Sequence, residues 1–287
     1  MTLIDEVGGP DGDLLGLYRV LGAGGDGPAN DPLRRELALR LADPKTLHRC
    51  LARRFEQGFR AVVVWSDKVL FEALGRRHEP DLPRVIPIVP NLQGFMREAV
   101  EYGMVGAGLR RAWRVGALSM AGMGLRGIGR LGEIKRRDFP TLLGSFIELE
   151  LADFRRYQPP LVLLQPQMTD LALAMHNPRI LEAFARTVAE RTGAAPGYIT
   201  CNFATLMASF KAWGIEPAAI VAPWHPAGYG MRPDVSACEQ AARACPAPIW
   251  AERRGALDAP LPAERSHLQK IGLVGVVRED PAVWSLQ

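Results

Sequence analysis

The chain is poor in cysteine, in long apolar runs and in charge of one sign. Its 287 residues hold four cysteines and no CxxC pair, so we expect a reducing, cytoplasmic setting and neither a disulfide framework nor a zinc finger. No apolar run reaches about 18 residues, and acids stand near the N-terminus where a signal peptide needs bases, so neither a membrane span nor an export signal is expected. A net charge of +4 is too small to indicate a nucleic-acid partner.

Short apolar runs alternate with amphipathic stretches along most of the chain. The runs are nearly continuous in apolar character and are bounded by Gly or Pro, as expected of parallel strands buried on both faces. Eight of them in about 270 residues predict an α/β fold, a single (β/α)8 TIM barrel over residues 1–287. An open doubly wound sheet would give the same alternation and is the alternative. The runs are 18–23, 60–65, 84–89, 160–165, 197–200, 218–222, 247–251 and 272–277.

Helix start signals stand between these runs. Asp43-Pro44 and Asn177-Pro178 each place a capping residue before a proline at the first helical position. Gly193 follows the helix expected after Asn177, and Asp234 stands at the start of another amphipathic stretch. The helices are therefore expected where a barrel needs them.

One interval between the apolar runs is much longer than the others, because the third run begins at residue 84 and the fourth only at residue 160. Residues 103–132 hold nine glycines, and residues 97–137 hold nine Arg or Lys against three Glu. A loop this long after a barrel strand predicts a basic, Gly-rich lid, residues 92–139, over the site. Its charge favours a small anionic metabolite. A membrane-surface segment over 97–137 and a merely solvated insertion are the alternatives.

From residue 61 to 280 the order of segments resembles the aldo-keto reductase superfamily. Residues 200–226 (TCNFATLMASFKAWGIEPAAIVAPWHP) resemble its fifth strand, helix and sixth strand, with Cys-Asn-Phe at the family's Ser-Asn-Phe. Residues 268–284 resemble its eighth strand and the start of its cofactor-phosphate loop. The resemblance implies the same barrel. It also implies NADPH as the cofactor to consider, with Asn202 and Arg278 at cofactor-binding positions.

The chain departs from that family at the catalytic tetrad. The second strand has no Asp-Thr-Ala and no following Tyr, Val89 or Pro90 stands at the Lys position, and Gln165 replaces the His. A Tyr hydroxyl with a pKa near 10 needs a cationic neighbour to act as an acid at neutral pH. Val221 and Ala251 stand where the family has a Gln and a stacking Tyr. The sequence therefore predicts a divergent relative without the usual reductase chemistry and with no cofactor.

Polar residues just past the strand ends are the candidate site residues of a barrel. Asp170 and His225 are predicted to transfer protons, although Asp170 would also suit a helix N-cap and His225 a structural role. Cys201 is a candidate nucleophile if a helix N-terminus stabilises its thiolate. Gln165 and Gln167 would point the same way if the strand continues that far. The predicted substrate-binding residues are Gln165, Gln167, Asn202, Trp65, Asn91, Tyr229, Arg232, Glu252 and Arg254.

These features predict a cytoplasmic, biosynthetic enzyme of small-molecule metabolism. Its reaction would be acid–base chemistry of lyase, isomerase or hydrolase type on an anionic metabolite, with Arg232 and Arg254 as anion clamps. No HxH or HExxH pattern indicates a metal site. The alternatives are an NADPH-dependent oxidoreductase with an atypical proton donor, and a non-catalytic barrel that binds a partner or a membrane surface through residues 97–137.

Overall fold

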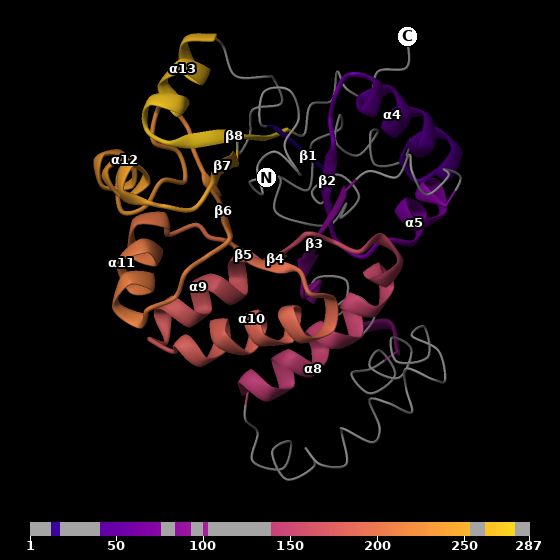
Figure 1. Cartoon of the computed structure of the whole chain (residues 1–287), viewed down its shortest axis with the longest axis horizontal. Coiled ribbons are helices and arrows are strands. Elements are labelled where there is room, and N and C mark those ends of the chain that lie inside the picture. The colour runs from indigo at the N-terminus through magenta and orange to yellow at the C-terminus, as the bar shows by residue number, and fades with distance from the viewer. Residues whose placement is uncertain are drawn as a thin grey trace.

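The computed structural model describes residues 13–17, 41–75, 84–92, 100–102, 139–252 and 262–278. Eight parallel strands follow one another around a closed barrel, and β8 pairs with β1 (Figure 1). This closure confirms the (β/α)8 barrel and excludes the open sheet. The strands are β1 Leu14–Gly16, β2 Ala61–Val64, β3 Arg84–Val89, β4 Leu161–Leu164, β5 Ala195–Ile199, β6 Ala219–Pro223, β7 Ile249–Glu252 and β8 Leu273–Arg278.

Helices surround the barrel (Figure 1). The expected caps are confirmed at three of them: the carboxylate of Asp43 accepts the Thr46 N–H at 2.9 Å, Asn177 precedes a helix that ends at left-handed Gly193, and Asp234 caps another. The helices are α4 Pro44–Glu56, α5 Lys68–Leu74, α8 Phe139–Leu151, α9 Pro166–Ala174, α10 Pro178–Thr192, α11 Phe203–Trp213, α12 Val235–Ala244 and α13 Pro262–Lys270, with a 3₁₀ helix η2 over Ala152–Tyr157.

The first strand is not where the sequence pattern put it. β1 is Leu14–Gly16, whereas the expected run 18–23 lies outside the described residues. Leu14 pairs with Val277 of β8, and Leu15 pairs with Val62 of β2. Both leucines are fully buried, because a barrel strand carries apolar side chains on its inner and outer faces alike. Only three residues long, the strand was too short for a pattern of apolar runs to find.

Alternate residues of each strand face the barrel axis and stack in layers. Most of their apolar side chains belong to one buried cluster, which includes Trp250, Val221 and Leu163. The strand registers place Glu252 in the last complete layer before the carboxyl ends. From the amino end upward, the layers are Ala61, Leu161 and Ala219; Leu14, Ile86, Gly197 and Trp250; Val63, Leu163, Val221 and Val277; Gly16, Ile88, Ile199 and Glu252; and Trp65, Gln165 and Pro223.

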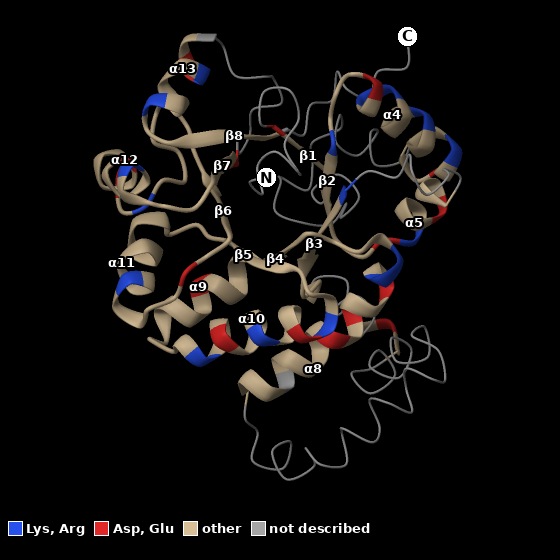
Figure 2. Cartoon of the chain, in the orientation of Figure 1, with Lys and Arg blue, Asp and Glu red and all other residues tan. Residues whose placement is uncertain are grey.

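The other faces of the strands pack against the helices in two further clusters. One joins β1 to β3 with α4, α5 and η2, and the other joins Val89 of β3 and strands β4 to β8 with α8 to α13. The expected lid, residues 92–139, falls almost wholly outside the described residues, so its role stays a prediction. Charged residues of both signs lie along α10 and α4, while the strands are mostly uncharged (Figure 2). No helix in the described ranges combines the length and the hydropathy needed to cross a membrane.

Candidate functional site

The carboxyl ends of the strands bring three of the predicted site residues to the barrel axis. Trp65 lies two residues beyond Val63 of β2, so its side chain points inward as those of Ala61 and Val63 do. It packs against the cluster of side chains that face the barrel axis. Gln165 lies two residues beyond Leu163 and faces the axis as Leu161 and Leu163 do. Glu252 lies two residues beyond Trp250 and faces the axis in the same way. We call Trp65, Gln165 and Glu252 the mouth residues. They come from β2, β4 and β7, so only closure of the barrel brings them together.

Gln165 is the most unusual of the mouth residues. It is 1% exposed, and its Nε2 is a buried donor with no hydrogen-bond partner among the described residues. A buried polar group left without a partner costs about 1–3 kcal/mol. Such groups in folded proteins are satisfied by water or a ligand. The Gln165 side chain therefore offers a hydrogen-bond donor at the barrel mouth that no described residue occupies.

Gln167 does not share this place, which corrects the expectation that Gln165 and Gln167 point the same way. β4 ends at Leu164, and Pro166 begins α9 immediately after Gln165. Proline fixes a φ that suits the first helical position, so the chain turns into a helix instead of continuing as a strand. Gln167 is consequently exposed on α9.

Asp170 lies within α9 and is not the N-cap of a helix, so that alternative is wrong. Its Oδ1 accepts the hydroxyl of Thr200 at 2.6 Å, and its Oδ2 accepts the backbone N–H of Cys201 at 3.1 Å. The hydroxyl of Thr200 in turn accepts the N–H of Asn202 at 2.9 Å. This network fixes the turn between β5 and α11. Thr200 is fully buried and was missed in the sequence, although a hydroxyl at a strand end was a visible signal.

Cys201 and Asn202 lie between β5 and α11. Asn202 occupies the N-cap of α11, yet its side chain makes no capping hydrogen bond. Cys201 and Cys245 are partly exposed, and burial raises the pKa of the thiols of Cys50, Cys238 and Cys245 above the ordinary value. Cys201 follows the carboxyl end of β5.

The polar groups that follow β2 and β3 mainly make hydrogen bonds that stabilise the fold. Asp67 caps α5 by accepting the N–H of Leu70 at 3.0 Å, and Ser66 donates to Asp153 at 2.6 Å. The backbone N–H of Asn91 donates to the buried carboxylate of Glu150 at 2.6 Å. Asn91 itself is 9% exposed. The sequence carried no signal for Asp153 or Glu150, because their partners lie on other elements.

His225 lies on the rim of the barrel, beyond β6. Its Nδ1 accepts the backbone N–H of Ala227 at 3.0 Å, and its ring meets that of Tyr229 edge to face, with centroids 5.9 Å apart. It lines a pocket between α12 and α13 and is not joined to Asp170 by any contact of the described residues. Tyr229 and Arg232 are exposed. Arg254 lies outside the described residues, as does the side chain of Arg278.

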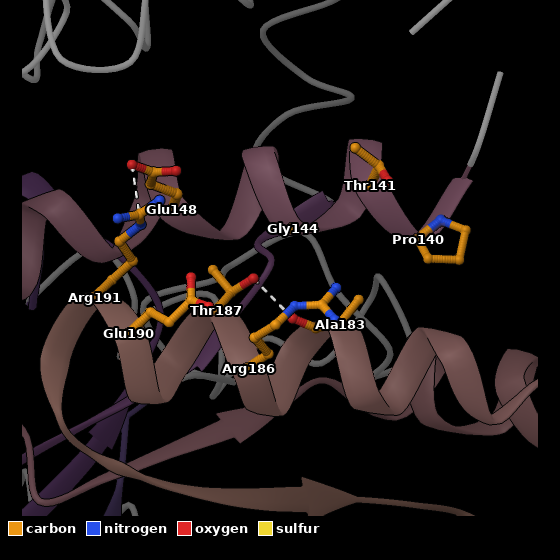
Figure 3. A pocket seen from close by; sticks show the side chains of 9 residues that line it. All are labelled: Pro140, Thr141, Gly144, Glu148, Ala183, Arg186, Thr187, Glu190 and Arg191. Carbon is orange, nitrogen blue, oxygen red and sulfur yellow. Dashed lines mark hydrogen bonds and ion pairs between the residues drawn. The ribbon is translucent and has the colours of Figure 1, made fainter. Parts of the chain in front are cut away.

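A polar pocket of about 200 Å³ separates α8 from α10 on the flank of the barrel (Figure 3). The Nε of Arg191 lies 3.1 Å from Oε1 of Glu148, which is 6% exposed. Figure 3 shows Thr141 and Gly144 on α8 facing Thr187 and Arg186 on α10. This pocket takes in none of the mouth residues, and its ion pair joins the two helices to each other.

The described residues do not gather a set of metal ligands, and two positions of the predicted cofactor pocket carry apolar side chains. No three acidic, histidine or cysteine side chains gather around a common point in the described ranges. Val221 and Ala251, which the sequence resemblance aligns with a Gln and a stacking Tyr, are buried and apolar, and Ala251 belongs to the cluster between the strands and the helices. Asn202, a further position that the resemblance implies, carries an amide side chain at the N-cap of α11.

Comparison with known proteins gives little beyond this geometry. No protein-family model matches the chain, and no curated protein matches it. Among solved structures, the chain is similar to an aldo/keto reductase from Brucella melitensis at 12% sequence identity, with a TM-score of 0.45, over 97% of this chain and 90% of that one. The assignment of the (β/α)8 barrel therefore depends on the strand pairing of this chain itself.

Proposed function

We propose that the chain is an enzyme that transfers a proton on a small substrate held at the barrel mouth. The observation that carries the proposal is the buried Nε2 of Gln165, which has no partner among the described residues and faces the axis. A donor in that state suits a carbonyl or carboxylate oxygen of a substrate. Glu252, 4% exposed in the adjoining layer, supplies a carboxylate that takes or gives the proton.

The roles predicted for Asp170 and His225 are revised in this proposal. Asp170 accepts two donors from the β5–α11 turn, so it positions Cys201 and Asn202 instead of meeting the substrate. His225 lines a pocket beside α12 and α13. Glu252 and Gln165 are held on strand ends, which fix a reacting group more rigidly than loops do.

The reaction class that fits is proton abstraction beside a carbonyl, as in isomerases and lyases. Gln165 would hold the carbonyl oxygen as negative charge develops on it, while Glu252 takes the proton from the neighbouring carbon. Trp65 would exclude water from one side of the substrate. The four cysteines are free, which supports a cytoplasmic location for such an enzyme, since the cytoplasm keeps thiols reduced.

Hydrogen exchange tests this proposal without knowledge of the product. A panel of 2-oxo and 2-hydroxy acids and their amides is incubated with the protein in D2O, and loss of the C–H signal next to the carbonyl is followed by NMR. At least one compound should exchange, and E252Q should abolish the exchange while E182Q, at an exposed position of α10, leaves it intact. Q165A should weaken it by about 100-fold, and the exposed Q167A should not. Exchange that survives E252Q would refute the proposal.

A second candidate is an NADPH-dependent oxidoreductase with an atypical proton donor. It is favoured by one observation, the uncapped and partly exposed side chain of Asn202 at the end of β5. Titration with NADPH, followed by quenching of tryptophan fluorescence, separates the two functions. Saturable binding at micromolar NADPH that N202A weakens would favour the oxidoreductase. A protein that neither exchanges protons nor binds NADPH would favour the non-catalytic barrel.

A further inference from the structure

A pocket of about 300 Å³ lies outside the barrel, between α12, α13 and the segment after β6. Trp224 and Leu268 line it, and both belong to the cluster formed by the outer faces of the strands and the helices. The mouth residues instead continue the axis-facing cluster. The pocket is therefore a separate place from the site of the proposed function.

Most of the pocket wall is apolar. Trp224 is 4% exposed and Leu268 is likewise buried, and Pro226, Val235 and Ala263 complete the apolar lining. Ligand sites of small molecules are commonly apolar, with a few polar groups that fix orientation. An engineered apolar cavity of about 150 Å³ holds one benzene ring. The present volume thus suits a body of roughly two fused rings.

The polar groups of the pocket are not equally available. The two carboxylate oxygens of Glu239 are held by His267 Nε2 at 2.9 Å and by Arg243 Nη2 at 2.9 Å. His225 is different. Its Nδ1 accepts the Ala227 N–H at 3.0 Å, so in the neutral ring the proton is on Nε2. No described residue accepts a hydrogen bond from that Nε2–H, which leaves one donor for a ligand.

The charges of the lining argue against an anion. Glu239 and Glu264 line the pocket, and no Lys or Arg is among its described lining residues. An anionic ligand would meet two carboxylates in the wall, while the guanidinium of Arg243 is already paired with Glu239. The acceptor that meets His225 has to be an uncharged one, such as a ring nitrogen or a carbonyl oxygen.

We propose that this pocket binds an uncharged ligand about the size of two fused rings, whose hydrogen-bond acceptor meets Nε2 of His225. Tyr229, in edge-to-face contact with the His225 ring, keeps that ring oriented. Trp224 and Leu268 bury the apolar rings of the ligand, and the nearby acidic side chains exclude anions.

Two probes of nearly equal shape test the chemistry. Quinoline has a neutral ring acceptor, and naphthalene has none. Binding is followed by NMR of the imidazole C–H signals, because the chain has five histidines and the pocket holds two, His225 and His267. Quinoline should shift these two signals and leave the other three in place. It should bind about fivefold more tightly than naphthalene, which matches one net hydrogen bond.

Two variants separate the pocket from non-specific binding. A263F fills the pocket and should remove the shifts, whereas A189F, at an exposed position of α10, should not. H225F keeps an aromatic ring but loses the donor, so quinoline and naphthalene should bind it equally. Equal binding of quinoline and naphthalene by the unmodified protein, or shifts that persist in A263F, would overturn the proposal. These binding measurements are independent of the proton-exchange assay with E252Q and Q165A. A negative binding result would therefore overturn this proposal without contradicting the proposed function.

Discussion

Asp13 and Arg265 form a bidentate ion pair at the place where β1 and β8 close the barrel. Nη1 and Nη2 of Arg265 donate to the two oxygens of the Asp13 carboxylate at 3.1 and 2.9 Å. One of these oxygens also accepts the backbone N–H of Val276 at 3.0 Å. Asp13 precedes β1, Val276 is in β8 and Arg265 is in α13, so one buried carboxylate ties the first strand to the last strand and its helix.

Loss of that carboxylate should destabilise the whole barrel. D13A would remove the acceptor of all three of these hydrogen bonds, and removing one partner of a buried ion pair costs about 3 kcal/mol or more. Urea unfolding followed by circular dichroism measures the loss. E182A, at an exposed position, should leave the unfolding midpoint unchanged, and a D13A midpoint equal to that of the unmodified protein would contradict the role of this ion pair.

The barrel could be predicted from the sequence because its signals are local and repeated. β3 was placed with correct bounds over Arg84–Val89, and Asp43, Asn177 and Asp234 marked three helix starts that the structure confirms. Buried parallel strands are apolar on both faces, and capping residues act within one turn of the chain. Such features can be seen without knowledge of any distant partner.

The candidate site was harder to predict because its members depend on contacts across the fold. Gln165 was expected beside Gln167, but the proline that starts α9 separates their directions. Asp170 looked like a free carboxylate until Thr200 and Cys201, 30 and 31 residues away, were found as its donors. A sequence shows which side chains carry chemistry. It does not show which of them are already satisfied by another element.

The bonds of Asp170 lead to a test of its positioning role. T200V keeps the shape of the side chain but removes the hydroxyl, and D170N weakens acceptance of both donors, so each should cost about 1–2 kcal/mol. Because the two side chains share one hydrogen bond of 2.6 Å, the double variant should lose about 1 kcal/mol less than the sum of the single variants. Chemical denaturation of the four proteins measures this coupling. Strict additivity would show that the bond contributes nothing.

Gly197 should tolerate no side chain. A Cβ at this position would lie 2.7 Å from Cδ2 of Leu163 and 3.1 Å from the carbonyl oxygen of Ala219, inside the same barrel that holds the fully buried Trp250. G197A should therefore destabilise the protein by about 1–3 kcal/mol through overpacking. Shortening the neighbour in the double variant G197A/L163V should recover part of the loss. Thermal unfolding measures both, and a G197A protein as stable as the parent would show that the barrel interior has spare room.

Tyr198 makes the stability of the protein sensitive to high pH. Its ring packs edge to face against Phe184 and Phe210, and burial raises the pKa of its hydroxyl well above the ordinary value of 10. In the unfolded chain the phenol ionises above pH 10, whereas in the folded protein it stays neutral. Its contribution is therefore fully present below pH 10 and is lost as the pH rises further, by about 1.4 kcal/mol per pH unit.

Y198F isolates this contribution. The variant keeps the ring and its two aromatic contacts, so its free energy of unfolding at pH 7 should stay close to that of the parent. Between pH 10 and 11 the parent should lose about 1 kcal/mol more than Y198F, because only the parent gains an ionised phenol on unfolding. Urea unfolding at pH 7, 9, 10 and 11 gives the comparison. Tyr157 and the buried thiols also have raised pKa values, but they are common to both proteins and cancel. Parallel pH profiles would mean that the Tyr198 hydroxyl ionises as easily in the folded barrel as in the unfolded chain.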